Sequence, residues 1–295
     1  MIEIHQPLGD TYYGHHYMLS LAQYLQEVCD SESKRIIDEF IRVRNYESQA
    51  RLIDKLVRSG AANVKASPQY HQPQQQQVNP LELDVLLSEV TLLHTRADLY
   101  FRFLKRRVGG SLDALPAEHK EKAKKKEGLE RLVKSCGLSR RMQELIGQYI
   151  AMEQYYMQNS IHKAIKRHSD NAEESTAATP GGGEKSWSMV DDVFFMIRKC
   201  VRRALSSSSV DCVCAMLNNA SALLETDFHG LILGDLKSGY PTVGSLAEAY
   251  STAAAAYSSV TAGRIPPAEG ADRAREHFVA ALNHAQATAE CTPSL

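Results

Sequence analysis

Apolar side chains recur every three or four residues along most of this chain, a spacing that predicts helices. Strict alternation of apolar and polar residues is nowhere sustained, and no hairpin dipeptide lies between β-branched runs, so strands are not expected. One predicted helix covers residues 31–58, with Gly60 expected to stop it. Its apolar positions are Ile36, Ile37, Phe40, Ile41, Leu52, Ile53, Leu56 and Val57. The pattern predicts an all-α fold.

The clearest helix start lies at Asn79. Asn79 can cap the helix, Pro80 suits the first helical position, and Glu82 follows three residues after the cap. An apolar face then continues to Val108, and we expect Gly109-Gly110 to end the helix. At ~1.5 Å per residue, such a helix is roughly 45 Å long. This length favours an elongated bundle of long antiparallel helices, joined by flexible linkers.

Further helices are predicted on both sides of residue 169. A lysine-rich helix is expected from Pro116 to Ser135, and Ser139 is expected to cap the next helix. Ser188 is expected to cap a later one. A polar turn at 206–209 then precedes a single long helix over 210–237 that stops at Gly239, and the rest is helical with a break at Pro266-Pro267.

Two polar stretches divide the chain into five predicted parts. Residues 67–79 are rich in Gln and Pro, and residues 169–187 are rich in Gly and Ser, so both are expected to be flexible. The predicted parts are an N-terminal helical segment (1–66), the flexible insert (67–79), a central helical bundle (80–168), the linker (169–187) and a portion of a C-terminal helical bundle (188–295).

Composition narrows the class of protein. The 34 Lys and Arg residues balance 35 Asp and Glu residues, and this near-neutral total argues against a nucleic-acid partner. Six cysteines are too sparse for a disulfide scaffold and suit reduced thiols in the cytosol. No apolar run reaches membrane-spanning length, and the first residues lack the features of a secretion signal.

The His and Cys residues do not have the spacing that catalysis or metal binding requires. The sequence has no His-Glu-x-x-His, and the adjacent His15 and His16 would diverge by ~100° on a helix. Cys212 and Cys214 would point about 200° apart, so together with Cys200 they are predicted to be packed thiols. We therefore predict no metal site.

Two other motifs have simpler explanations than catalysis. The run 181–186 resembles a phosphate-binding loop, but Glu184 interrupts it and no strand precedes it. Asp191 and Asp192 suit the positive end of a helix dipole better than a pair of catalytic carboxylates. We predict that the protein is not an enzyme and holds no cofactor.

One charged stretch stands out against the neutral total. Residues 96–141, called the basic segment below, contain fourteen Lys or Arg and six acidic residues, a net charge of +8 beside −9 for the remainder. A solvated helix face explains such a stretch; a docking surface for an acidic partner or an anionic membrane is the alternative. The candidate docking residues are Arg102, Lys105, Arg106, Arg107, Lys124, Lys125 and Lys126.

Several longer strings resemble one family. They are 188–195 (SMVDDVFF) with Lys199-Cys200, 203–212, 142–147 and 99–105, and more weakly Cys29-Asp30, 37–41 and 277–283. Together they resemble subunit 4 of the conserved oligomeric Golgi complex, a vesicle tether. The resemblance covers residues 18–290 and is strongest between 80 and 240. Residues 1–17 show none, and the stretches 67–79 and 178–185 look foreign to the family pattern.

The resemblance implies a function that composition and spacing do not give. It implies a non-enzymatic scaffold, peripheral on the cytosolic face of Golgi membranes, that supports retrograde transport within the Golgi. The implied partners are other subunits of the tethering complex, and SNARE and SM-class fusion proteins. Members of the family are longer, and their segment for the fusion machinery lies towards the N-terminus. The chain is thus expected to be a partial or truncated form.

Overall fold

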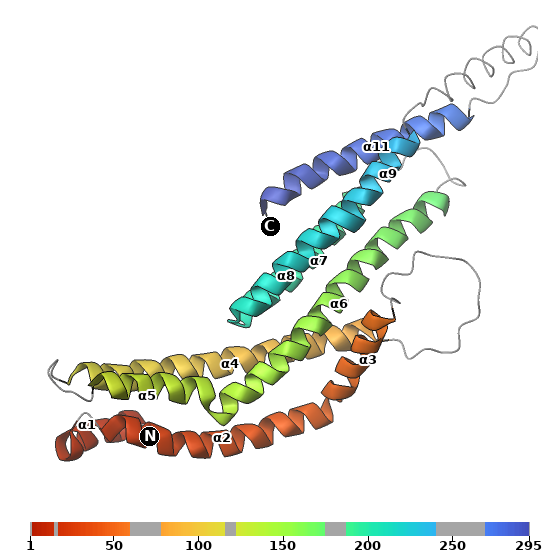
Figure 1. Ribbon diagram of the computed structural model, residues 1–295. Helices are drawn as coiled ribbons and strands as arrows, with labels where there is room; N and C mark the ends of the chain where they lie inside the picture. The colour runs from red at the N-terminus through yellow and green to blue at the C-terminus, as the bar shows by residue number, and fades with distance from the viewer. Residues whose placement is uncertain are drawn as a thin grey trace, which may run out of the picture. The chain divides into compact units, whose positions relative to one another are not determined.

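The computed structural model describes residues 2–14, 17–59, 78–115, 122–174, 187–239 and 269–294. Every element in these ranges is helical, which confirms the predicted all-α fold (Figure 1). The elements are α1 (Ile2–Tyr13), α2 (Tyr17–Val43), α3 (Tyr46–Arg58), α4 (Pro80–Asp113), α5 (Lys122–Ser135), α6 (Gly137–Glu174), α7 (Trp187–Ser206), α8 (Val210–Leu223), the π-helix η3 (Leu224–Phe228), α9 (His229–Gly239), α11 (Glu269–Cys291) and the short 3₁₀ helix η4 (Thr292–Ser294).

Contacts between residues divide the chain into two compact units. Unit 1 comprises Met1–Met157 and Cys200–Met216, and unit 2 comprises Gln158–Lys199 and Leu217–Leu295. Most of the predicted insert (residues 67–77), the linker residues 175–186, the His15-His16 pair and the predicted break at Pro266-Pro267 lie outside the described residues.

One hydrophobic cluster of unit 1 forms where α2, α4 and α5 lie side by side (Figure 1). These helices contribute one buried cluster: Met18, Leu19 and Ala22 from α2, Leu104, Val108 and Leu112 from α4, the following Leu115, and Leu129 and Val133 from α5. The cluster explains why α4 does not end at Gly109-Gly110, as the sequence predicted. Burial of Val108 and Leu112 on either side outweighs a cost of about 1 kcal/mol per helical glycine.

The start of α4 follows the prediction. The Asn79 side-chain oxygen accepts a hydrogen bond from the Leu81 amide at 3.1 Å, and its amide nitrogen donates to Glu82 at 3.0 Å. Pro80 occupies the first turn, where its missing N–H costs nothing. The cap is therefore set by four consecutive residues, which is why sequence alone identifies it.

The helix predicted over residues 31–58 is wrong in two respects. It begins earlier, at Tyr17, and it breaks between α2 and α3 because Asn45 adopts a left-handed backbone conformation with φ 50°. Asn tolerates this conformation better than most residues. The break turns α3 so that Tyr46 is fully buried and its hydroxyl donates to the Leu145 carbonyl at 2.9 Å.

The N-terminus of α6 is capped from another helix. Asp30 of α2 accepts hydrogen bonds from the amides of Gly137 and Leu138, both at 2.8 Å. The prediction that Ser139 caps this helix is wrong, because α6 already begins at Gly137 and a distant carboxylate satisfies its first donors. A Cβ on Gly137 would lie 3.0 Å from the Asp30 Cγ, so any other residue would force the Asp30 side chain to shift.

The contacts within unit 2 include buried apolar side chains, ring contacts and a hydrogen-bonded His–Asp pair. Phe194 of α7 packs edge-on against Phe228 of η3, with ring centroids 6.3 Å apart. His162 of α6 lies 2.8 Å from the Asp227 carboxylate. Within the same unit, α9 packs against α11.

Three predicted boundaries differ in this part of the chain. α6 continues to Glu174, past the predicted linker start at residue 169. Just before that point, the His168 ring packs edge-on against the His284 ring, with centroids 4.9 Å apart. α7 begins at Trp187, so Ser188 lies inside its first turn and is not a cap. The helix predicted over 210–237 is continuous to Gly239 but contains the π-helical turn η3. The polar turn after Ser206 is confirmed.

Candidate functional site

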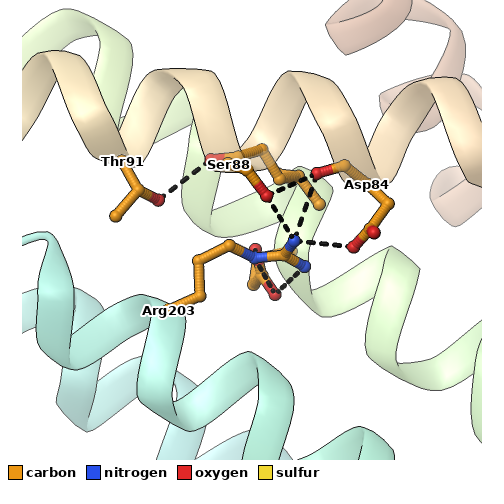
Figure 2. Close-up of polar contacts among 6 residues, drawn as sticks. Asp84, Ser88, Thr91 and Arg203 are labelled. Carbon is orange, nitrogen blue, oxygen red and sulfur yellow. Dashed lines mark hydrogen bonds and ion pairs between the residues drawn. The ribbon is translucent and has the colours of Figure 1, made fainter.

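Arg203 lies at the centre of the most extensive polar cluster among the described residues of unit 1. It comes from the last turn of α7, and only 8% of the residue is exposed. Figure 2 shows its guanidinium pointing between α4 and α6. The arginine is carried there by the apolar face of α7, whose Cys200 and Ala204 are fully buried beside it.

Two carboxylates hold the guanidinium. Glu153 of α6, which is fully buried, accepts from Nε at 2.9 Å and from Nη2 at 2.7 Å. Asp84 of α4 accepts from Nη1 at 2.7 Å (Figure 2). Nη1 also donates to the Ser88 hydroxyl at 3.3 Å and the Asp84 carbonyl at 3.2 Å. The plane of the guanidinium lies over the Tyr156 ring, 5.1 Å from its centroid.

The charges of the cluster are fixed by their surroundings. Burial acts to lower the pKa of Arg203, but the Glu153 charge and the hydrogen bonds from Glu153 and Asp84 outweigh it and raise the pKa further above its usual range. The guanidinium is thus permanently charged and joins α4, α6 and α7. Such a cluster makes one packing arrangement of the three helices preferred over others.

Three of the seven candidate docking residues of the basic segment form ion pairs with other described residues. Arg102 pairs with Asp98 at 2.7 Å, Lys105 with Glu130 at 3.2 Å, and Lys126 with Asp113 at 2.5 Å. The pairing with Lys126 lowers the pKa of Asp113. The Lys105 and Lys126 pairs cross between α4 and α5, so part of the basic segment joins these helices.

Two candidate cations stay exposed without an ion pair to any described residue, Arg106 of α4 and Lys124 of α5. Arg107 lies over the Phe103 ring, 5.8 Å from its centroid, and Lys125 is half-buried. An open cavity of about 290 Å³ is lined by Gln6, Phe103, Arg106, Arg107, Gly110 and Ser111. Phe103, Arg106 and Arg107 are thus brought together on one part of α4.

The cysteines differ from the prediction at one position. Cys200 and Cys212 are fully buried, and burial raises the pKa of the Cys212 thiol to about 11. Cys214 was predicted to be packed but is exposed, because it lies two residues along α8 from the buried face. Within the described ranges, no three His, Cys, Asp or Glu side chains lie together as metal ligands would.

Sequence reasoning missed the partners of Arg203. Glu153 and Asp84 lie 50 and 119 residues from it in sequence. A glutamate in the middle of the apolar face formed by Tyr149, Met152 and Tyr156 is the sequence feature that could have indicated a buried cation partner.

Comparisons with known proteins agree on one family. The model of the family described as COG4 transport protein, middle alpha-helical bundle, matches residues 1–236. Proteins named conserved oligomeric Golgi complex subunit 4 from Mus musculus and Homo sapiens are 35% identical over 98% of this chain. The protein of the same name from Drosophila melanogaster is 33% identical over 100% of it. No solved structure gives a significant match.

The extent of these matches corrects one expectation and is consistent with another. The match of the family model includes residues 1–17, where the sequence strings had shown no resemblance. The chain covers 35% of the length of the mouse and human proteins and 38% of the fly protein. Separately, none of the helices in the described residues is both long and apolar enough to cross a bilayer.

Proposed function

The chain belongs to the family of subunit 4 of the conserved oligomeric Golgi complex, and we propose that it acts as a non-enzymatic scaffold in a Golgi-associated tethering complex. The observation that carries the proposal is the match along nearly the whole chain to relatives whose name states membership of such a complex. The proposed location is the cytosolic face of Golgi membranes, and the proposed process is retrograde transport within the Golgi.

Helix-to-helix contact is the proposed mechanism. Tethering requires stiff elements with broad surfaces, and long amphipathic helices such as α4 and α6 provide them. The Arg203 cluster supports this role because it fixes the packing of α4, α6 and α7 within unit 1. Exposed helix faces then remain in constant positions for docking to other subunits of the complex.

Affinity purification from cells tests the proposal. The tagged chain should recover other subunits of the Golgi complex, measured by quantitative mass spectrometry against a tagged full-length relative. Recovery of none by the chain, while the full-length relative recovers them, would refute the proposal for this chain. For the longer proteins of the family, we extend the proposal to SNARE and SM-class fusion proteins, which the same purification of the full-length relative tests.

A second candidate function is binding to anionic membranes through the basic segment. The observation in its favour is the exposure of Arg106 and Lys124 without an ion pair to any described residue. Liposome sedimentation decides it. Binding should rise with the anionic lipid content, fall with salt and weaken when Lys124, Lys125 and Lys126 are neutralised. Binding that ignores salt or lipid charge would rule it out.

A further inference from the structure

One side of α4 exposes apolar side chains along most of its length. Leu81, Val85, Leu92 and Leu99 are between 50% and 78% exposed, and Phe103 is 37% exposed. A helix turns about 100° per residue, so these five side chains fall within an arc of about 40°. They form what we call the α4 stripe, about 33 Å long at ~1.5 Å per residue.

The α4 stripe is separate from the face that packs unit 1. The buried side of α4 carries Leu83, Leu86, Leu87, Val90, Leu104 and Val108. Ser88, which accepts a hydrogen bond from Arg203, and the exposed Arg96 interrupt the row. Soluble proteins nonetheless seldom leave so long a row of apolar side chains open to water without a function for it. A stripe with one residue per one or two turns matches the anchors by which an amphipathic helix docks onto another.

The charges beside the stripe indicate what docks there. Arg96, Arg102, Arg106 and Arg107 all lie within about 80° of the centre of the stripe, beside its C-terminal half. Asp98, the acidic residue nearest to them on α4, is paired with Arg102 at 2.7 Å. Arg96 and Arg106 are exposed and form no ion pair with described residues. This half of the stripe is therefore strongly positive.

The N-terminal half of the stripe lacks this positive border. Glu82 and Glu89 lie beside it, and Glu89 is paired with Arg44. The charge pattern is thus asymmetric along the stripe. An acidic partner helix would be attracted at one end only, which would set its direction and register.

We propose that the α4 stripe docks an amphipathic helix of another protein, with an apolar spine and acidic residues gathered at one end. The apolar spine packs on Leu92, Leu99 and their neighbours, and the acidic end pairs with the arginines. Arg107 over the Phe103 ring gives this end an aromatic and guanidinium pair, a combination frequent in interface hot spots. The inference rests on the proposed function, since a scaffold subunit needs such surfaces.

Synthetic helices test the chemistry directly. The first peptide has 22 residues, leucines at the spacing of the stripe, and glutamates at one end. A second has lysines in place of the glutamates, and a third has serines in place of the leucines. Fluorescence anisotropy measures their binding to the whole chain. The acidic peptide should bind at least tenfold more tightly than either control, and its affinity should fall with salt.

Substitutions on the protein locate the site. The double variant Leu92→Glu, Leu99→Glu should bind the acidic peptide more than tenfold less tightly than the wild type does. Val28→Glu on α2 is the matched control, since Val28 is 55% exposed and Leu92 is 54% exposed. Arg106→Glu should lower the affinity for the acidic peptide several-fold. Lys124→Glu, which also changes an exposed cation, should leave this affinity unchanged. Circular dichroism verifies that each variant keeps its helix content.

Four results would overturn the inference. Equal affinity for the acidic and lysine peptides refutes the charge argument, and an unchanged affinity of the Leu92→Glu, Leu99→Glu variant refutes the site. A dimer of the chain that Leu99→Glu dissociates, seen by light scattering, assigns the stripe to a second copy. Binding to anionic vesicles that the double variant abolishes assigns it to a membrane.

The experiment separates this inference from the proposed function. If the tagged chain still recovers other subunits of the Golgi complex but the acidic peptide fails to bind, only the α4 stripe is refuted. If the peptide binds as expected but the tagged chain recovers no subunits, the docking surface stands and the scaffold role in the Golgi complex is refuted.

Discussion

Replacing Arg203 by methionine should destabilise unit 1 severely. Methionine keeps much of the side-chain length but removes the charge, so Glu153, which is fully buried, loses the cation that compensates it. Breaking a buried pair from one side costs about 3–5 kcal/mol. Asp84 adds little to this cost, because its side chain is 26% exposed and can be solvated once the guanidinium is gone.

Removing both charges should recover most of the stability that Arg203→Met loses. In the double variant Arg203→Met, Glu153→Met no charge is left buried, and the two methionines can pack against each other and Tyr156. We expect the double variant to lose about 1–2 kcal/mol relative to the wild type, less than Arg203→Met alone. The resulting coupling energy between Arg203 and Glu153 should exceed about 2 kcal/mol.

Equilibrium urea unfolding followed by circular dichroism measures these free energies. The control is Arg102→Met, which breaks an ion pair with Asp98 in which the arginine side chain is 64% exposed. An exposed pair of this kind contributes less than about 1 kcal/mol. If Arg203→Met costs no more than this control, or if the losses of the two single variants simply add, the buried cluster does not stabilise the helices as described.

Three further predictions concern helix ends and a buried histidine. Gly137→Ala should cost about 1–2 kcal/mol in urea unfolding because its Cβ would press on Asp30, whereas Gly147→Ala, which meets nothing within 4 Å, should be neutral or stabilising; equal effects would refute the close approach. Asn79→Ala should cost about 1 kcal/mol through loss of the α4 cap, and an unchanged urea midpoint would contradict it. Burial lowers the pKa of His94 from 6.5 to about 4, so only the unfolded state binds a proton as the pH falls through this range. The stability should therefore decline by up to about 3 kcal/mol between pH 6.5 and pH 4, and in His94→Leu this part of the pH dependence should be absent.

Local chemistry made part of the fold predictable. The cap at Asn79 depends on four consecutive residues, and the end of α5 at Ser135 on the Cys136-Gly137 that follows. The turn after Ser206 depends on a run of serines, of which Ser208 has a positive φ. In each case, the residues that determine the structure are adjacent in sequence, so the sequence alone is enough to predict it.

Contacts between distant residues explain what the sequence did not reveal. Asp30 caps α6 from 107 residues away, and nothing near Gly137 indicates this. The persistence of α4 through Gly109-Gly110 depends on packing of Leu112 against α2 and α5. The break at Asn45 is an intermediate case, because Asn is a known left-handed residue but the apolar spacing continues across it.

Some features of the candidate site can likewise be predicted from adjacent residues, and others depend on contacts between distant ones. The basic segment and its seven cations are visible in the sequence, and the Arg102–Asp98 pair could have been inferred from its i, i+4 spacing. The pairs of Lys105 and Lys126 with acids on the neighbouring helix require the fold. The α4 stripe was hidden because a helix with apolar residues on two sides has no simple pattern that separates its buried face from its exposed one.

Direct reconstitution tests the scaffold role most closely. The purified chain would be mixed with the purified Golgi complex that lacks its subunit 4, and the mixture separated by size-exclusion chromatography. We predict that the chain elutes with the complex and that Arg203→Met lowers the amount that does so. Separate elution of the chain, under conditions in which a full-length relative elutes with the complex, would contradict it.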